Sequence, residues 1–308
     1  MLQILQKNGF PAFFLSAIIS LMKKIFYRLA LFILCSVGIS TVCQMQTNGF
    51  RLQEILSDIP NNSAWEVDPL TDQQQKEVIQ NLNQTFYYLG SGKQSHAFLG
   101  EDQKTVLKFF RHNDLSLMKI VKHLSPEKWL WHLMTNYDPR QVFDSCKLAY
   151  LDLQDETGIS YLHINKTRDQ FKPVVLVDNS GVSHTINLDK TEFMVQDYCE
   201  LATTRIAARM KSKDLEGAKE SVKALLASIE DWSRRGILID NPALKRNIGF
   251  CKDKVIMLDV GSLRKESSAR TEERIQQEVK RTTRGLARWI YKKYPELYLC
   301  FEKELAKP

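Results

Sequence analysis

The chain has few of the features that mark disulfide-stapled, zinc-binding or nucleic-acid-binding proteins. Its six cysteines are scattered without short paired spacings, which favours buried thiols over a disulfide framework or a zinc site. It has no repeats, no low-complexity tract and no basic stripe interleaved with aromatic residues. A nucleic-acid partner is therefore not expected.

The net charge of +7 is modest for 308 residues, of which 44% are hydrophobic and 26% charged. This is ordinary globular composition, with room for one two-lobed domain or two small ones. Acids and bases are interleaved, for example around Glu273 and Lys280. We interpret these segments mainly as solvated helix faces, with a smaller allowance for an anionic partner such as a lipid headgroup.

The N-terminal region has an uncharged, largely apolar stretch from Leu29 to Phe50, preceded by Lys23, Lys24 and Arg28. A basic flank followed by an apolar run is typical of a signal peptide, and this run is also long enough to cross a bilayer. Residues 1–45 are therefore predicted to be a signal peptide or a membrane anchor. The cations on one flank place the rest of the chain across the membrane, in an extracytoplasmic space or a secretory lumen.

Two further features of the sequence concern its predicted export and location. Met22 opens a compact signal-like sequence, so we interpret residues 1–21 as an over-extended start. Asn-x-Ser/Thr triplets begin at Asn61, Asn83 and Asn165, and these are compatible with a lumenal location.

The remainder divides by pattern into three parts. Residues 46–84 are predicted to be a linker with a short helix, residues 85–200 a β-rich nucleotide-binding lobe, and residues 201–308 a helical lobe. Alternating apolar residues and polar turns predict strands at 85–89, 97–99, 105–110, 159–164, 173–177, 182–188 and 192–196. Residues 237–239 and 248–250 are short apolar pieces, and residues 255–258 are predicted to be a buried strand. Helical spacings predict helices at 112–149, 215–235 and 271–293, followed by a short helical tail. The fold class is therefore α+β.

A glycine turn and a lysine in an apolar strand are the first candidate site residues. Gly90 and Gly92 flank Ser91, where backbone N–H groups could approach phosphate oxygens without obstruction by a side chain. Lys108 lies between Leu107 and Phe109. A buried ammonium is costly without a partner, so an acid or a phosphate is expected to meet it, unless the strand is a solvated edge.

The acid that would pair with Lys108 is expected on the following helix. Asp144, Asp152 and Glu156 are the candidates, and sequence does not choose between them. Each lies further from Lys108 than the matching acid does in typical kinases, and a solvated surface role is the more economical interpretation of each.

Two acids and an amide follow in the second half of the chain. Asp259 ends an apolar run and is followed by Val260 and Gly261, a setting suited to chelation of magnesium between phosphates. Asp240, followed by Asn247 before a strand, has the layout of a catalytic loop. In that layout the acid accepts the proton of a hydroxyl group and the amide binds the metal.

This order of motifs resembles the protein-kinase-like superfamily over about residues 85–265, and is closer to divergent bacterial kinase-like and pseudokinase members than to eukaryotic protein kinases. The resemblance implies a two-lobed fold, with a β-rich N-lobe and a reduced helical C-lobe behind the N-terminal hydrophobic helix. It also implies ATP and Mg²⁺ as cofactors. The implied roles are phosphate contacts for Gly90, Gly92 and Lys108, adenine contacts along a hinge from Met194 to Cys199, and magnesium binding for Asn247 and Asp259.

The chain departs from the family pattern at its catalytic loop. Six residues separate Asp240 from Asn247, whereas typical members have four. Counting back at the usual spacing reaches Pro242, whose side chain cannot move a proton, and Asn241 beside it is not a base. No activation segment follows Gly261.

Three functions remain open. The first is an ATP-dependent phosphotransferase acting on a protein or a small molecule. The second is a pseudokinase that acts as a membrane-tethered interaction module. The third is a domain without nucleotide, in which the lysine and the acids form a structural ion-pair network.

Overall fold

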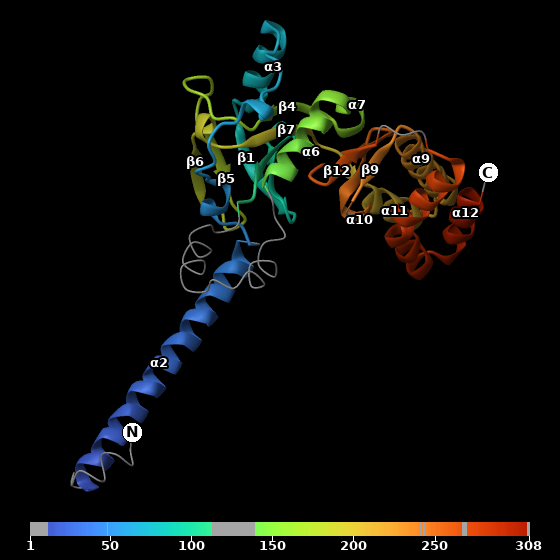
Figure 1. Ribbon diagram of the computed structural model, residues 1–308. Coiled ribbons are helices and arrows are strands. Elements are labelled where there is room, and N and C mark those ends of the chain that lie inside the picture. Colours follow the sequence, from blue (N-terminus) through green and yellow to red (C-terminus); the bar gives the residue numbers. More distant parts are fainter. Residues whose placement is uncertain are drawn as a thin grey trace. The chain divides into compact units, whose positions relative to one another are not determined.

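The computed structural model describes residues 12–47, 49–112, 139–240, 242, 244–266 and 270–306. Contacts divide the chain into residues 1–50 and 51–308. The first unit contains helix α2 (Ala12–Gln46), drawn in blue in Figure 1. Within the described residues, no helix has the length and apolar content of a membrane span. The signal peptide or anchor at residues 1–45 stays a prediction.

The second unit begins with short helical segments, η1 (Leu52–Ile55) and η2 (Ser63–Trp65), followed by helix α3 (Asp72–Leu82). A capping box starts α3: the Thr71 side chain accepts from the Gln74 backbone N–H, and the Gln74 side chain accepts from the Thr71 N–H. These two bonds satisfy backbone donors that the first turn of a helix leaves open.

A seven-stranded sheet in the order β4-β7-β3-β2-β1-β5-β6 forms the first half of this unit. Its β1–β5 pair is parallel and its other pairs are antiparallel. The sheet confirms the predicted strands of this region, with bounds β1 (Thr85–Ser91), β2 (Ser95–Gly100), β3 (Thr105–Phe110), β4 (Ile159–His163), β5 (Val174–Val177), β6 (Ser183–Ile186) and β7 (Phe193–Asp197).

Helices α6 (Pro139–Asp152) and α7 (Gln154–Thr157) lie between β3 and β4 in the chain. The helix predicted over 112–149 is described only from Pro139, and its earlier residues lie outside the described part. Phe143 of α6 packs edge-on against Phe110 of β3 and against Trp65, with ring centroids 5.0 and 4.9 Å apart. These aromatic contacts hold α6 to the sheet.

The second half is mainly helical. It contains α8 (Ala202–Lys211), α9 (Leu215–Arg234), α10 (Leu244–Asn247), α11 (Glu272–Lys293) and α12 (Pro295–Leu305). The predicted helices at 215–235 and 271–293 and the helical tail are confirmed, and α9, α11 and α12 pack against one another (Figure 1). Helix α9 ends before Gly236, which has φ +75° and would place a Cβ 2.2 Å from the Glu266 carbonyl oxygen. Only glycine fits that turn.

Two small sheets accompany these helices. Strands β10 (Ile248–Cys251) and β11 (Lys254–Met257) form a hairpin that pairs with β8 (Glu200–Leu201). Strand β9 (Ile237–Ile239) pairs with β12 (Leu263–Lys265). The architecture is thus mixed α+β, with one large mixed sheet and a helical half, and it is compatible with two lobes.

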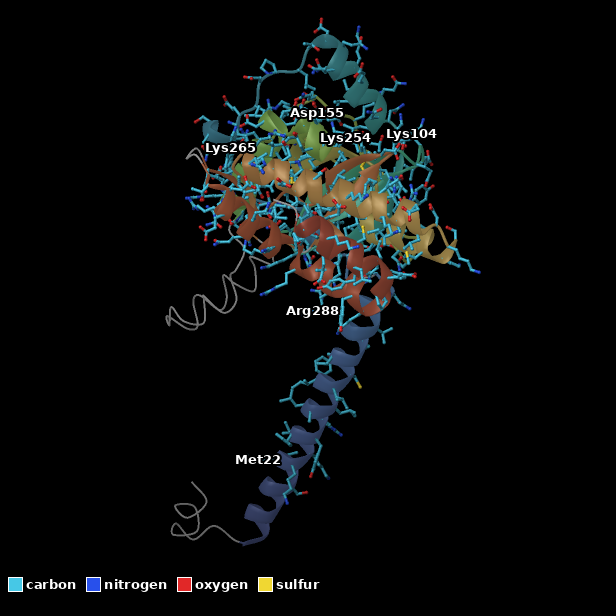
Figure 2. The ribbon with its side chains drawn as sticks, turned by 90° about the vertical axis from the view of Figure 1, so that its right-hand side faces the viewer. Met22, Lys104, Asp155, Lys254, Lys265 and Arg288 are labelled. Carbon is cyan, nitrogen blue, oxygen red and sulfur yellow. A yellow bond between two sulfur atoms is a disulfide. The ribbon has the colours of Figure 1, made fainter. Side chains whose placement is uncertain are left out.

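Ion pairs join the α6–α7 segment to the second half of the unit. Asp152 accepts from Lys265 at 2.7 Å, and Asp155 lies 3.3 Å from Lys254, close to it in Figure 2. Glu156 pairs with Arg235. Where the α6–α7 segment meets the second half, the buried Gln196 amide donates to the carbonyls of Thr157 and Met257.

A disulfide corrects the expectation of free thiols. Cys199 and Cys251, 52 residues apart, are bonded. Spacing along the chain did not reveal the bridge because β8 and β10 bring the two cysteines together only in the folded protein: Glu200 pairs with Phe250. Cys35, Cys146 and Cys300 are free thiols.

Hydrogen bonds hold the segment after residue 50 against the loops of the large sheet. Ser57 donates to both oxygens of Glu192, at 2.7 and 2.8 Å. The Asn61 side-chain amide donates to the Lys166 carbonyl at 2.8 Å, and the Asn165 amide donates to the Asn62 carbonyl at 2.9 Å. The predicted linker is therefore an ordered part of the folded unit over these residues.

Candidate functional site

Three of the candidate nucleotide-binding residues lie in one row across the large sheet. Gly90 of β1 pairs with Ala97 of β2, Ala97 pairs with Lys108 of β3, and Lys108 pairs with Met194 of β7. Because paired residues of antiparallel strands face the same side, the side chains of Lys108 and Met194 are direct neighbours. Gly92 lies in the turn beyond, where its N–H donates to the Ser95 carbonyl at 2.8 Å.

The lysine and the two candidate metal ligands converge at Leu258. The Lys108 Nζ donates to the Leu258 carbonyl at 2.5 Å. The Leu258 N–H donates to the Asn247 carbonyl at 2.8 Å. Asp259 is the next residue, and its carboxylate accepts from the Gly261 N–H at 3.3 Å. Lys108 and Asp259 are 151 positions apart in the chain, yet both lie at the peptide group between Leu258 and Asp259.

Side chains from the sheet half also hold the segment that follows Asp259. Ser145 of α6 is buried, donates to the Val260 carbonyl at 2.5 Å and accepts from the Leu263 N–H at 2.6 Å. Gln94, from the glycine turn, donates to the Gly261 carbonyl at 3.0 Å. Backbone groups before and after Gly261 are thus fixed from α6 and from the turn, so the position of Asp259 depends on both.

The electrostatic environment of Lys108 is set by burial and by one carboxylate. Burial lowers the pKa of Lys108, and the negative charge of Asp259 opposes this shift. Burial also raises the pKa of the nearby Cys146 thiol well above its ordinary range, which keeps the thiol neutral. Cys146 lies on α6, and it is a neutral group that this helix brings near the lysine.

None of the three acids weighed as partners of Lys108, all of which lie in the described part, pairs with it. Asp144 accepts from the Trp65 indole at 3.2 Å. Asp152 and Glu156 pair with Lys265 and Arg235 of the second half. The interpretation of these acids as something other than the lysine's partner is confirmed: Asp144 and Asp152 are exposed at the surface, whereas Glu156 is half-buried.

Asn247 and Asp259 are the residues that could hold a metal. Among the described residues, no group of three or more His, Cys, Asp or Glu side chains could bind one by itself. An amide oxygen and a carboxylate oxygen are nevertheless hard ligands of the kind that Mg²⁺ prefers, with phosphate oxygens and water completing its octahedron. The pair fits a metal that arrives with a polyphosphate.

Asp240 lies apart from this cluster but borders the same segment. Its N–H donates to the Ser262 carbonyl at 3.0 Å, and its carboxylate accepts from Arg264 at 2.7 Å. It lines a cavity of about 530 Å³ together with Gly261, residues of α6, and Lys93 and Gln94 of the glycine turn. Pro242, two positions after Asp240, is described, whereas Asn241 lies outside the described residues.

Cys199, the last residue of the candidate hinge, is the disulfide partner of Cys251. Its sulfur therefore cannot act as a free thiol toward a ligand. The bridge ties the end of the hinge to the β10–β11 hairpin, which carries Asn247 and Asp259 at its open end.

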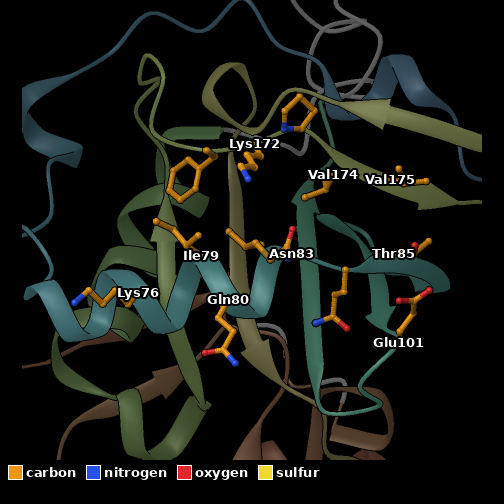
Figure 3. A pocket seen from close by; sticks show the side chains of 13 residues that line it. Lys76, Ile79, Gln80, Asn83, Thr85, Glu101, Lys172, Val174 and Val175 are labelled. Carbon is orange, nitrogen blue, oxygen red and sulfur yellow. The ribbon is translucent and has the colours of Figure 1, made fainter.

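A second cavity, of about 610 Å³, lies between α3 and the β1 and β5 strands (Figure 3). Its wall combines apolar side chains such as Ile79 and Val174 with the polar side chains of Lys172 and Glu101. None of the candidate site residues lines it, so it is not part of the candidate nucleotide site.

Two residues that matter to this site were missed in the sequence. Gln94 and Ser145 are ordinary polar residues whose role arises from contacts 167 and 115 residues away. A weak signal existed for Ser145, because a hydroxyl among the apolar positions of α6 requires a hydrogen-bond partner.

Comparison with known proteins gives a faint likeness. No family model and no curated protein matches the chain. A structure of the bifunctional kinase-methyltransferase WbdD matches at 17% identity with a TM-score of 0.30, over 70% of this chain and 43% of WbdD. A complex of Rv3197 from Mycobacterium tuberculosis with erythromycin matches at 15% identity and a TM-score of 0.29, over 94% of this chain and 75% of that one. The chain spans less than half the length of WbdD, and similarity this low assigns neither fold family nor activity.

Proposed function

We propose that residues 51–306 form a kinase-like domain that binds ATP with Mg²⁺ and transfers a phosphoryl group. The observation that carries this proposal is the convergence on Leu258, the residue before Asp259: Lys108 donates to its carbonyl, and its N–H donates to the backbone carbonyl of Asn247. A lysine beside a carboxylate, with an asparagine joined through its backbone to the same segment, supplies the residue types needed to hold a polyphosphate and its metal.

In this proposal each side chain has a defined task. The Lys108 ammonium leaves the Leu258 carbonyl and donates to phosphate oxygens instead, because these are charged acceptors and form a stronger bond. Asn247 and Asp259 hold the metal, which supplies charge neutralisation when bound. Gly90 and Gly92 leave the phosphate path open, and Met194 borders the adenine.

The cavity beside Asp240 is the proposed site of the phosphate acceptor. It reaches from the glycine turn to Gly261, so a hydroxyl group placed in it lies near both the base and the metal-binding segment. Asp240 accepts the hydroxyl proton, and Arg264 holds the carboxylate in place.

Thermal unfolding with ATP and Mg²⁺ tests nucleotide binding. Ligand at 100 times its Kd stabilises a protein by about 2.7 kcal/mol, which for a domain of this size raises Tm by roughly 5–11 °C. Lys108→Met and Asp259→Asn should each abolish this rise, whereas the exposed substitutions Lys104→Met and Asp253→Asn should retain it. If ATP and Mg²⁺ do not change the Tm of the wild type, only the third function, a domain without nucleotide, remains.

A pseudokinase is the second candidate, and specific contacts favour it. Lys108 bonds a backbone carbonyl and no acid from α6, and Asp240 is held by Arg264. Turnover of ATP separates the two functions. If Asp240 is the base, Asp240→Asn should keep the nucleotide-dependent rise in Tm and lose turnover; a wild type that binds without turnover would identify the pseudokinase.

We also propose that the domain is exported or anchored at a membrane by residues 1–45. The Cys199–Cys251 disulfide supports this location, because such bridges persist in oxidising compartments and are rare in reducing ones. Peptide mapping of the N-terminus of the protein isolated from its cells distinguishes a cleaved signal from a retained anchor. Reduced cysteines in that isolated protein would contradict an oxidising location.

A further inference from the structure

The second part of helix α11 is strongly basic on its exposed face. From Lys280 to Lys293 the helix contains six basic residues and no acid. Four of the six recur at every fourth position and therefore line one side of the helix. We call these four exposed residues the basic row: Lys280, Arg284, Arg288 and Lys292. Figure 2 labels Arg288 at the outer side of the C-terminal helices.

The basic row has no counter-charge within the described part of the chain. Neighbouring cations of the same helix do have partners: Arg281 pairs with Glu278 at 2.5 Å, and Lys293 lies over the Trp289 ring at 5.8 Å. Like charges four positions apart destabilise a helix. An anionic surface that covers the row would relieve this mutual repulsion.

A glycine beside the row has no internal explanation. Gly285 lies within α11, where alanine would stabilise the helix better. A Cβ at this position would meet no atom within 4 Å, so packing inside the protein does not require glycine here. The missing side chain lets an outside surface come closer to Arg284 and Arg288.

One exposed apolar side chain lies beside the row on α11, and another lies on the neighbouring helix α12. Tyr291 is 60% exposed and Leu299 is 63% exposed, the largest values for big hydrophobic residues in the described part after residue 50. Tyr291 is three positions after Arg288 and shares its face of α11. Its ring lies 5.0 Å from that of Tyr298 in α12, the residue before Leu299.

We propose that the basic row docks on an anionic lipid surface. Lysine and arginine side chains attract anionic headgroups, while tyrosine and leucine enter the boundary between headgroups and acyl chains. A nucleic acid would also attract the cations, but it offers no apolar layer for Leu299. The proposal is independent of nucleotide binding, because none of these residues belongs to the cluster around Leu258.

Residue-resolved acetylation of lysines tests the proposal on the full chain. An N-terminal anchor would bind neutral and anionic vesicles alike, so the labelling of single lysines is measured rather than total binding. With vesicles that contain phosphatidylglycerol, Lys280 and Lys292 should be labelled at least about fivefold more slowly than with phosphatidylcholine alone, since each contact is worth about a factor of five. The protection should disappear at roughly 0.5 M salt.

Matched variants locate the effect. Arg284→Gln combined with Arg288→Gln should remove most of the protection at Lys280 and Lys292. Lys211→Gln combined with Lys213→Gln, which changes the net charge equally at exposed positions of α8 and the turn after it, should leave the protection intact.

The wild-type comparison decides the proposal even if a variant folds poorly. Equal labelling of Lys280 and Lys292 on both kinds of vesicle would overturn it. Protection by duplex DNA or by an acidic polypeptide, without protection by anionic vesicles, would overturn it as well and assign the row to that partner. Equal loss of protection in both double variants would show that net charge alone, not the row, is responsible.

Discussion

Reduction of the Cys199–Cys251 bridge should lower stability by an amount that follows from the chain it encloses. The bridge closes a loop of 52 residues. In the chain-entropy treatment, such a loop removes about 14 cal/mol/K from the unfolded ensemble, or about 4 kcal/mol at 25 °C. The folded state loses little on reduction, because the β8–β10 pairing holds the two residues together without the bond.

The assay is thermal unfolding followed by circular dichroism, with and without a thiol-free reductant. For a domain of this size, a loss of about 4 kcal/mol corresponds to a fall in Tm of roughly 8–16 °C. The double variant Cys199→Ser with Cys251→Ser should have the Tm of the reduced wild type, whether or not reductant is present. Cys300→Ser, which removes a free thiol of α12, should respond to reductant as the wild type does.

Two outcomes would refute this reasoning. Thiol titration of the unfolded, non-reduced protein should find two fewer thiols than titration after reduction; equal counts would show that the bridge is not formed. If the counts differ but Tm does not change on reduction, the entropic account of the bridge is wrong.

Two further predictions concern buried polar groups of the folded unit. Ser145→Ala leaves the Val260 carbonyl and the Leu263 N–H without their side-chain partner and should lower the free energy of unfolding in urea by about 2–4 kcal/mol. The exposed control Ser183→Ala should change it by less than about 0.5 kcal/mol. Equal effects of the two substitutions would contradict the contacts of Ser145. Burial alone would raise the pKa of Glu192, but the His112 ring, whose Nε2 lies 3.3 Å from the carboxylate, and the hydrogen bonds from Ser57 lower it below its ordinary value. A lowered folded pKa means that the stabilisation is present above the ordinary value of 4.5 and is lost as pH falls through the folded value. Glu192→Gln should therefore be less stable at pH 7 and should lose less stability on acidification below pH 4.5; parallel pH curves for the two proteins would contradict this.

Much of the fold could be predicted because local pattern and final structure agree. The alternation around Lys108 marks β3, and the apolar positions of α9 recur at helical spacing up to Gly236. Strands β8 and β12 were missed because they have two and three residues. They exist through pairing with β10 and β9, and segments this short carry no periodicity of their own.

The candidate site could be predicted only as a set of residue types in order. The order of Lys108, Asn247 and Asp259 in the chain predicted that they meet, but their meeting point at Leu258 depends on a backbone geometry that the order does not contain. The clasp of Gln94 on Gly261 joins parts of the chain 167 residues apart. Such contacts depend on the tertiary fold, which is why neither Gln94 nor the disulfide was expected.

The seam between the segment after residue 50 and the sheet bears on the asparagine triplets. The nitrogen to which a sugar would be attached is the same atom that Asn61 uses to reach Lys166 and that Asn165 uses to reach Asn62. An oligosaccharide on either nitrogen would occupy the space in which the opposing backbone packs. Glycan attachment and closure of this seam therefore compete for the same two atoms, and the closed conformation belongs to a chain whose Asn61 and Asn165 are unmodified.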